Sequence, residues 1–279
     1  MKISMLILGL AAAQVALDVA RTIEETKEWR RVREARLNED RGWLSVSGLA
    51  WLKDGETTIG SAEGNGVLLA DGPAHWGVVT RSGTKLTLRP QDGDAREVTP
   101  AEAPFQIGRT WVQAIRRADL LGFRLWDPQN ARKLAFPGLE WYEVGSDFRV
   151  KGRLIPSDPV RTVKIANVIG QVNDYVSPGV VEFTLGGKAL TLTPVFETAA
   201  RDELFYIFKD GTAAKTTYGA GRFVYSGLPD QDGMVILDFN RAYSPPCAFT
   251  DFATCPLPPA ENRLAVFIEA GEKDPHRAK

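Results

Sequence analysis

The stretch Val181-Glu182-Phe183-Thr184-Leu185-Gly186-Gly187 decides the fold class of this chain. Apolar and polar side chains alternate strictly from Val181 to Leu185, so one face of an extended strand packs on a core and the other meets water. The two glycines that follow tolerate the positive φ angles of a tight turn between two strands. The stretch therefore predicts antiparallel β structure.

The same pattern recurs along the chain in both directions. Residues 85–89 and 162–165 alternate in the same way, and turn dipeptides such as Asp92-Gly93 and Asp232-Gly233 separate the apolar runs. Short strands with turns about every ten residues are typical of a sandwich or barrel, and no strand–helix–strand rhythm appears. We therefore expect a mostly β protein, an antiparallel β-sandwich or barrel, with one β-rich domain over residues 21–279.

One amphipathic helix is expected before the first strand, from residue 22 to residue 37. Thr22 and Glu25 have the spacing of a capping box, and apolar residues follow on a loose stripe. The stripe consists of Ile23, Trp29, Val32 and Leu37.

The first 20 residues are typical of a signal peptide. Lys2 precedes an apolar run that ends in Ala11-Ala12-Ala13, and the run is shorter than the about 20 residues of a membrane-spanning helix. An ordinary buried helix is the alternative interpretation. We expect residues 1–20 to direct export to the periplasm or the extracellular space, with no stable membrane span after their removal.

Charge and cysteine content narrow the function further. The net charge is −1, from 34 basic and 35 acidic residues, which argues against a nucleic-acid partner. Cys247 and Cys255 lie eight positions apart between prolines, so in an oxidising compartment they would close a disulfide loop worth on the order of 2–3 kcal/mol. In a reducing compartment they would be two thiols. No metal site is expected, because the chain has only two histidines and no Cys-x-x-Cys.

Several catalytic classes lack their sequence signatures. A histidine-based serine hydrolase is not expected, because no G-x-S-x-G elbow is present and both histidines lie in polar or proline-rich segments. Ser82-Gly83-Thr84-Lys85 matches S-x-x-K but lies across a predicted turn. Neither a phosphate-binding loop nor a dinucleotide fingerprint occurs, so no cofactor is expected.

The remaining chemistry gathers in a polar segment, residues 203–272. Predicted strands cover residues 204–208, 221–225 and 234–240, and in the last of these Asp238 and Asn240 share one face. Buried Asp and Asn need partners, and Arg222 on the neighbouring strand is a candidate for a charge-assisted pair. One interpretation is a polar network that fixes the strands and the following loop. The other is a ligand pocket lined by Asp210, Tyr218, Arg222, Asp238, Asn240 and Tyr243.

The C-terminal sequence resembles that of a bacterial family known as domain of unknown function 1684. The resemblance is carried by Asp238-Phe239-Asn240, by Pro245-Pro246-Cys247-Ala248-Phe249 and by Cys255-Pro256-Leu257-Pro258-Pro259. It extends over about residues 29–272 and includes Gly42-Trp43-Leu44 near the N-terminus. Ser244 stands where Asn is expected, and Gly211-Thr212 where Ala-Thr is usual. The resemblance implies one continuous domain and transfers no catalytic residue.

Three functional hypotheses follow. The first is an exported protein that binds a small polar or anionic ligand in a polar-lined β pocket, with Arg222 as the charge partner. The second is a hydrolase that uses Asp210 or Asp238 as a general base or to hold a water-bound divalent cation. The third is a structural or interaction protein of the cell envelope.

Overall fold

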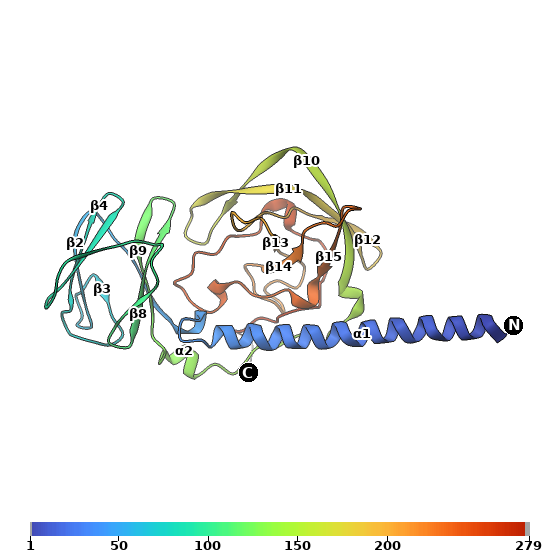
Figure 1. Ribbon diagram of the computed structural model, residues 1–279, viewed down its shortest axis with the longest axis horizontal. Coiled ribbons are helices and arrows are strands. Elements are labelled where there is room, and N and C mark those ends of the chain that lie inside the picture. The colour runs from blue at the N-terminus through green and yellow to red at the C-terminus, as the bar shows by residue number, and fades with distance from the viewer. Residues whose placement is uncertain (1, 277–279) are drawn as a thin grey trace. The chain divides into compact units, whose positions relative to one another are not determined.

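The computed structural model describes residues 2–276, and at residues 2–18 it describes the backbone alone (Figure 1). The chain forms two compact units. Within the described residues, unit 1 comprises the chain up to Glu34, Gly138–Ala248 and the chain from Thr254 onward, and unit 2 comprises Ala35–Pro137 and Phe249–Ala253. The predicted β-rich domain, residues 21–279, thus contains two centres of packing.

Unit 2 is a sandwich of two sheets. One has the strand order β1-β9-β8-β7 and the other β3-β2-β4-β5-β6, and within the described residues only the β2–β3 pair is parallel. Phe123 and Leu125 from the first sheet share a core with Val79 and Leu88 from the second. The elements of unit 2 are β1 (Val46–Trp51), β2 (Gly55–Gly60), β3 (Val67–Leu68), β4 (Gly77–Ser82), β5 (Lys85–Pro90), β6 (Arg96–Val98), β7 (Phe105–Ile107), β8 (Thr110–Arg117), β9 (Leu120–Trp126) and the short helix α2 (Ala131–Leu134).

Unit 1 contains a four-stranded antiparallel sheet, β12-β11-β10-β15, and the pair β13-β14. Phe183, Tyr206 and Leu237 are buried in one core to which both sheets contribute. Gly186 and Gly187 have φ angles of 56° and 74° and form the tight turn between β11 and β12. The strands of unit 1 are β10 (Arg149–Ala166), β11 (Val172–Leu185), β12 (Lys188–Leu192), β13 (Glu203–Phe208), β14 (Arg222–Gly227) and β15 (Met234–Asp238).

The expected mostly β, antiparallel class with one N-terminal helix is confirmed, but one predicted strand is shorter than expected. The strand predicted for residues 234–240 ends at Asp238, and Phe239–Arg241 forms a 3-10 turn. The Asp238 carboxylate accepts the Asn240 amide at 3.1 Å and so caps the turn. Asp238 and Asn240 therefore do not share a strand face.

Helix α1 (Lys2–Leu37) begins before the predicted cap. It passes through Thr22 without a break, because no glycine or proline interrupts the chain from Leu10 to Leu37. The expected stripe lies on the inward side, with Leu37 buried and Ile23, Trp29 and Val32 partly buried. Thr26 is also buried, and Arg30 and Arg33 are partly buried beside the stripe. Among the described residues, no helix combines the length and apolar character that a membrane span requires.

Candidate functional site

Arg222 and Asp210 form an ion pair in the interior of unit 1. Arg222 begins β14 opposite Phe208, the last residue of β13, and Asp210 follows two positions later. Arg222 Nη2 lies 3.1 Å from Asp210 Oδ1, and both side chains are almost fully buried. Burial lowers the pKa of Arg222, and the Asp210 carboxylate opposes that shift. The charge-assisted partner of Arg222 is thus Asp210, whereas the sequence suggests Asp238 or Asn240.

The same pair binds the C-terminal segment of the chain. Arg222 donates to the Ile268 carbonyl at 3.0 Å and to the Ala270 carbonyl. Asp210 Oδ2 accepts the Ile268 amide at 2.8 Å and the Thr212 hydroxyl at 2.8 Å. These bonds hold residues 268–270 against β14. The pair therefore belongs to a polar network that stabilises the fold.

Tyr218 lies at a different place, beside the two cysteines. Its hydroxyl donates to the Cys247 carbonyl at 3.1 Å, and burial raises its pKa. The structure has no disulfide between Cys247 and Cys255; the Cys247 amide donates to Cys255 Sγ at 3.1 Å. The Cys255 thiol lowers the pKa of Cys247 against the opposing effect of burial.

Asp238 and Asn240 fix the segment before β10. Besides its bond to the Asn240 amide, Asp238 Oδ1 accepts Asn240 Nδ2 at 3.0 Å. The Asn240 side chain then forms a reciprocal pair with Gly145, accepting from its amide and donating to its carbonyl, both at 2.9 Å. The position of Gly145 is therefore set by two side chains at the end of β15.

Arginines surround the same carboxylate. Asp238 Oδ2 lies 3.9 Å from Arg149 Nε and 3.6 Å from Arg241 Nε. Arg30, from α1, donates to the Asn240 carbonyl at 3.0 Å; burial lowers its pKa, while Asp238 and Glu143 raise it. Positive charge from three elements thus converges on the end of β15.

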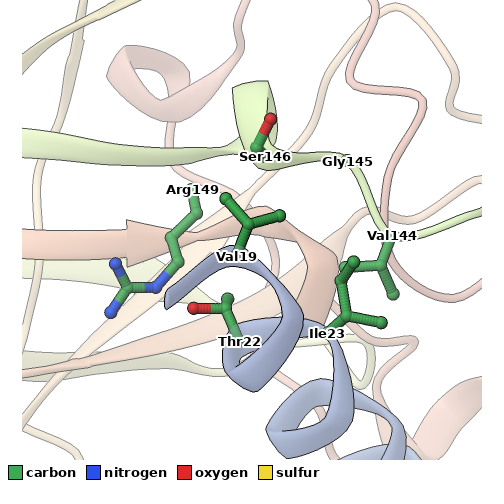
Figure 2. Close-up of a pocket in the computed structure, with 7 residues that line it drawn as sticks. All are labelled: Val19, Thr22, Ile23, Val144, Gly145, Ser146 and Arg149. Atoms are coloured by element: carbon green, nitrogen blue, oxygen red, sulfur yellow. The ribbon is translucent and has the colours of Figure 1, made fainter. Parts of the chain in front are cut away.

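A pocket of about 240 Å³ opens beside this network (Figure 2). The Arg149 guanidinium and the Thr22 hydroxyl lie on one side of it, and Ile23 and Val144 lie on the opposite side. The exposed lining is mostly apolar. The lining residues are Val19, Thr22, Ile23, Val144, Gly145, Ser146 and Arg149. The pocket therefore combines one cation with an apolar wall.

Tyr243 belongs to a third cluster, around the buried Glu272. The Arg33 guanidinium lies 4.6 Å from the Tyr243 ring centroid, and Arg33 Nε lies 3.5 Å from Glu272 Oε2. Burial raises the pKa of Tyr243 to about 12. Burial also raises the pKa of Glu272, although Arg33 and Ser244 act in the opposite direction.

The six predicted residues therefore divide among separate clusters. Asp210 and Arg222 form one, Asp238 and Asn240 another, Tyr218 lies beside Cys247, and Tyr243 packs against Arg33. None of the six is among the lining residues of the pocket in Figure 2.

Sequence reasoning missed Arg149, Arg33 and Glu272. Arg33 and Glu272 stand in segments rich in charge, where nothing in the local pattern marks a buried pair. Arg149 is the first residue of β10, and its place at the start of a strand was the only local feature that could have pointed to it. Among the described residues, no group of three or more His, Cys, Asp or Glu side chains is placed to hold a metal ion.

Comparisons with known proteins place these features in a family. A family model described as "Protein of unknown function (DUF1684)" matches residues 134–273, which include Arg149, Glu272 and all six predicted residues. The solution NMR structure of an uncharacterized protein from gene locus rrnAC0354 of Haloarcula marismortui is similar, with 28% sequence identity and a TM-score of 0.43. That similarity covers 53% of this chain and 82% of the other. No curated protein matches the sequence.

Proposed function

This chain belongs to the DUF1684 family of proteins of unknown function, and we propose that it binds a small amphipathic anion in the pocket of Figure 2. The observation that carries the proposal is the placement of Arg149. Its side chain is 42% exposed and lies in a pocket whose other walls are mostly apolar. A guanidinium at the polar end of an apolar pocket favours a ligand with an anionic head and an apolar body.

The carboxylates around Arg149 leave its guanidinium able to bind an anion. Asp238 lies 3.9 Å from Arg149, beyond hydrogen-bond distance, and is nearer to Arg241 at 3.6 Å. Its other oxygen accepts two bonds from Asn240. Glu25 lies 3.9 Å from Arg241, so Arg241 has a second carboxylate beside it in addition to Asp238. Arg149 carries five N–H donors, so a bidentate bond to a ligand carboxylate is compatible with this arrangement.

The size of the pocket limits the ligand. A volume of about 240 Å³ is below the about 300–1,000 Å³ typical of sites for drug-sized molecules. Ile23 and Val144 offer an apolar wall opposite the guanidinium, which suits a short aliphatic chain. We therefore favour short straight-chain monocarboxylates as the ligand class.

Two of the residues predicted from the sequence support the site from behind. Asn240 fixes Gly145, a pocket residue, and Asp238 lies beside Arg149. Their proposed role is to position the pocket wall and the guanidinium. Replacing Asn240 by Ala should weaken binding by releasing Gly145, while the cation stays in place.

Isothermal titration calorimetry with short straight-chain monocarboxylates, and with the primary amines of equal chain length, tests the proposal. We expect the acids to bind and the amines not to bind. Arg149→Gln should weaken acid binding about tenfold or more, since a charge-assisted bidentate bond is lost. Lys164→Gln makes the same charge change on β10 outside the pocket and should leave binding intact. Equal binding of amines, or full affinity in Arg149→Gln, would show the proposal to be wrong.

We also propose that the protein is exported, as the apolar run after Lys2 indicates. Removal of residues 1–20 would take Val19 from the pocket and leave Thr22, Ile23, Val144 and Arg149 in its lining. Fusing residues 1–20 to a reporter enzyme that is active only outside the cytoplasm should give activity, and replacing the apolar run with polar residues should abolish it.

The hydrolase hypothesis has less support. Asp210 is paired with Arg222, and Asp238 accepts bonds from Asn240, so both carboxylates already have protein partners. Turnover of pooled ester, glycoside and phosphate substrates that is lost in Asp238→Asn would favour it over simple binding.

A further inference from the structure

A second pocket lies within unit 2, on the face of the sheet β1-β9-β8-β7 that points away from the core. Trp111 and Gln113 on β8 alternate with the buried Val112 and Ala114, so they project from the outer face. Trp126 on β9 pairs directly with Trp111. The pocket has a volume of about 530 Å³ and is lined by Glu39, Asp40, Arg41, Pro104, Trp111, Gln113 and Trp126.

Two indole rings contribute flat apolar surface to this pocket. Trp111 is partly exposed, whereas Trp126 is 6% exposed and contributes a smaller part of the lining. The Arg41 guanidinium lies 5.1 Å from the Trp111 ring centroid and holds the ring by a cation–π contact. A fixed, partly exposed indole is a binding platform that loses little conformational entropy when a ligand stacks on it.

The rest of the lining is polar, and its charges balance. Glu39 and Asp40 are exposed carboxylates, and Arg41 is an exposed cation. Lys133 lies 2.9 Å from Asp40 and supplies the second positive charge. Two carboxylates thus face two cations, so the pocket has no net charge to attract a strongly ionic ligand. Gln113 adds an amide that both donates and accepts.

We propose that this pocket binds a neutral saccharide. A pyranose ring has an apolar C–H face, which would stack on Trp111, and a periphery of hydroxyl groups. Carboxylates accept hydrogen bonds from hydroxyls, guanidinium groups donate to them, and an amide does both. The volume lies within the about 300–1,000 Å³ of small-molecule sites. This site is distinct from the anion pocket of unit 1 and does not depend on the function proposed for it.

The test is binding of soluble hexasaccharides of glucose, xylose and N-acetylglucosamine to the full chain, measured by calorimetry and by tryptophan fluorescence. We expect at least one of them to bind. Trp111→Ala should weaken that binding about tenfold, equivalent to about 1.4 kcal/mol. Trp51→Ala removes an indole on β1, outside the pocket, and should leave affinity unchanged.

Gln113→Ala provides a second variant that removes hydrogen bonds and little packing, so it keeps the test decisive if Trp111→Ala does not fold. It should also weaken binding. The proposal is overturned if no hexasaccharide binds the wild-type chain, or if binding is unchanged in the folded Trp111 or Gln113 variant. Tighter binding of nucleosides than of every saccharide would overturn it as well, because stacking alone would then explain the pocket.

Discussion

Arg222→Met removes the cation from the interior of unit 1 and leaves a stem of similar length. The change leaves the Asp210 carboxylate buried beside a neutral side chain. It also takes a donor from the carbonyls of Ile268 and Ala270, which lie in a buried segment.

The expected loss of unfolding free energy is large. Breaking one partner of a buried ion pair costs about 3–5 kcal/mol, because a charge remains in the interior without its counter-ion. A buried carbonyl without a donor costs about 1–3 kcal/mol, and part of that cost is already contained in the first figure. We therefore expect a loss of about 4 kcal/mol. The total stability of a domain is about 5–15 kcal/mol, so unit 1 should be left marginal.

The assay is a urea titration followed by hydrogen exchange of peptides from β13 and β14, which report on unit 1. Lys164→Met serves as the control, because Lys164 pairs with Asp174 at the surface and both side chains are mostly exposed. It should leave the transition unchanged. The double variant Asp210→Asn with Arg222→Met should be no less stable than Arg222→Met alone, since the uncompensated charge has been removed. A loss below about 1 kcal/mol in Arg222→Met would refute the reasoning, because that is the worth of an exposed pair.

Two further predictions concern the C-terminal segment. Glu272→Gln should remove a pH dependence: burial raises the pKa of the folded carboxyl, so the stability it contributes is present below its ordinary value of 4.5 and is lost as pH rises through the folded pKa. Thermal unfolding should show wild type losing stability relative to the variant as pH rises from 4.5 to the raised pKa of the folded carboxyl. Equal pH dependence of wild type and variant would contradict this explanation. Gly271→Ala should cost more than 1 kcal/mol, since φ is 81° and the added Cβ would lie 2.4 Å from the Ala242 carbonyl oxygen. Gly186→Ala, with φ of 56° and open space around the Cβ, should cost less in urea denaturation; an equal cost would contradict the steric explanation.

The strands could be predicted from the sequence because their signal is local. The alternation from Val181 to Leu185 and the two glycines after it depend only on neighbours in the chain, and the structure has β11, the turn and β12 there. The end of β15 could not be predicted by alternation, because a hydrogen bond from the Asn240 backbone amide to the Asp238 carboxylate decides it. Periodicity cannot register a capping bond of this kind.

The grouping of the polar residues could not be predicted for a related reason. Alternation with a period of two assigns a residue to one face of a strand, but it does not identify the residue that the side chain contacts. Asp210 and Arg222 pair across two neighbouring strands. Asn240 binds Gly145, and Glu272 lies beside Arg33, and in each of these two pairs the residues are far apart in sequence. Helix α1 shows the same limit, since Arg30 and Arg33 are partly buried beside its stripe, although a hydrophobic pattern assigns them to solvent.

Arg30 and Arg33 also constrain the order in which the molecule can be built. They leave the ribosome early, yet their partners are the carbonyls of Tyr142, Asn240 and Ser244, which are synthesised much later. Unit 2, drawn almost wholly from one continuous stretch, has most of its material once residue 137 has emerged. Unit 1 cannot be completed until nearly the entire polypeptide has been synthesised. A prematurely terminated product would therefore carry most of unit 2 and a unit 1 without its closing contacts.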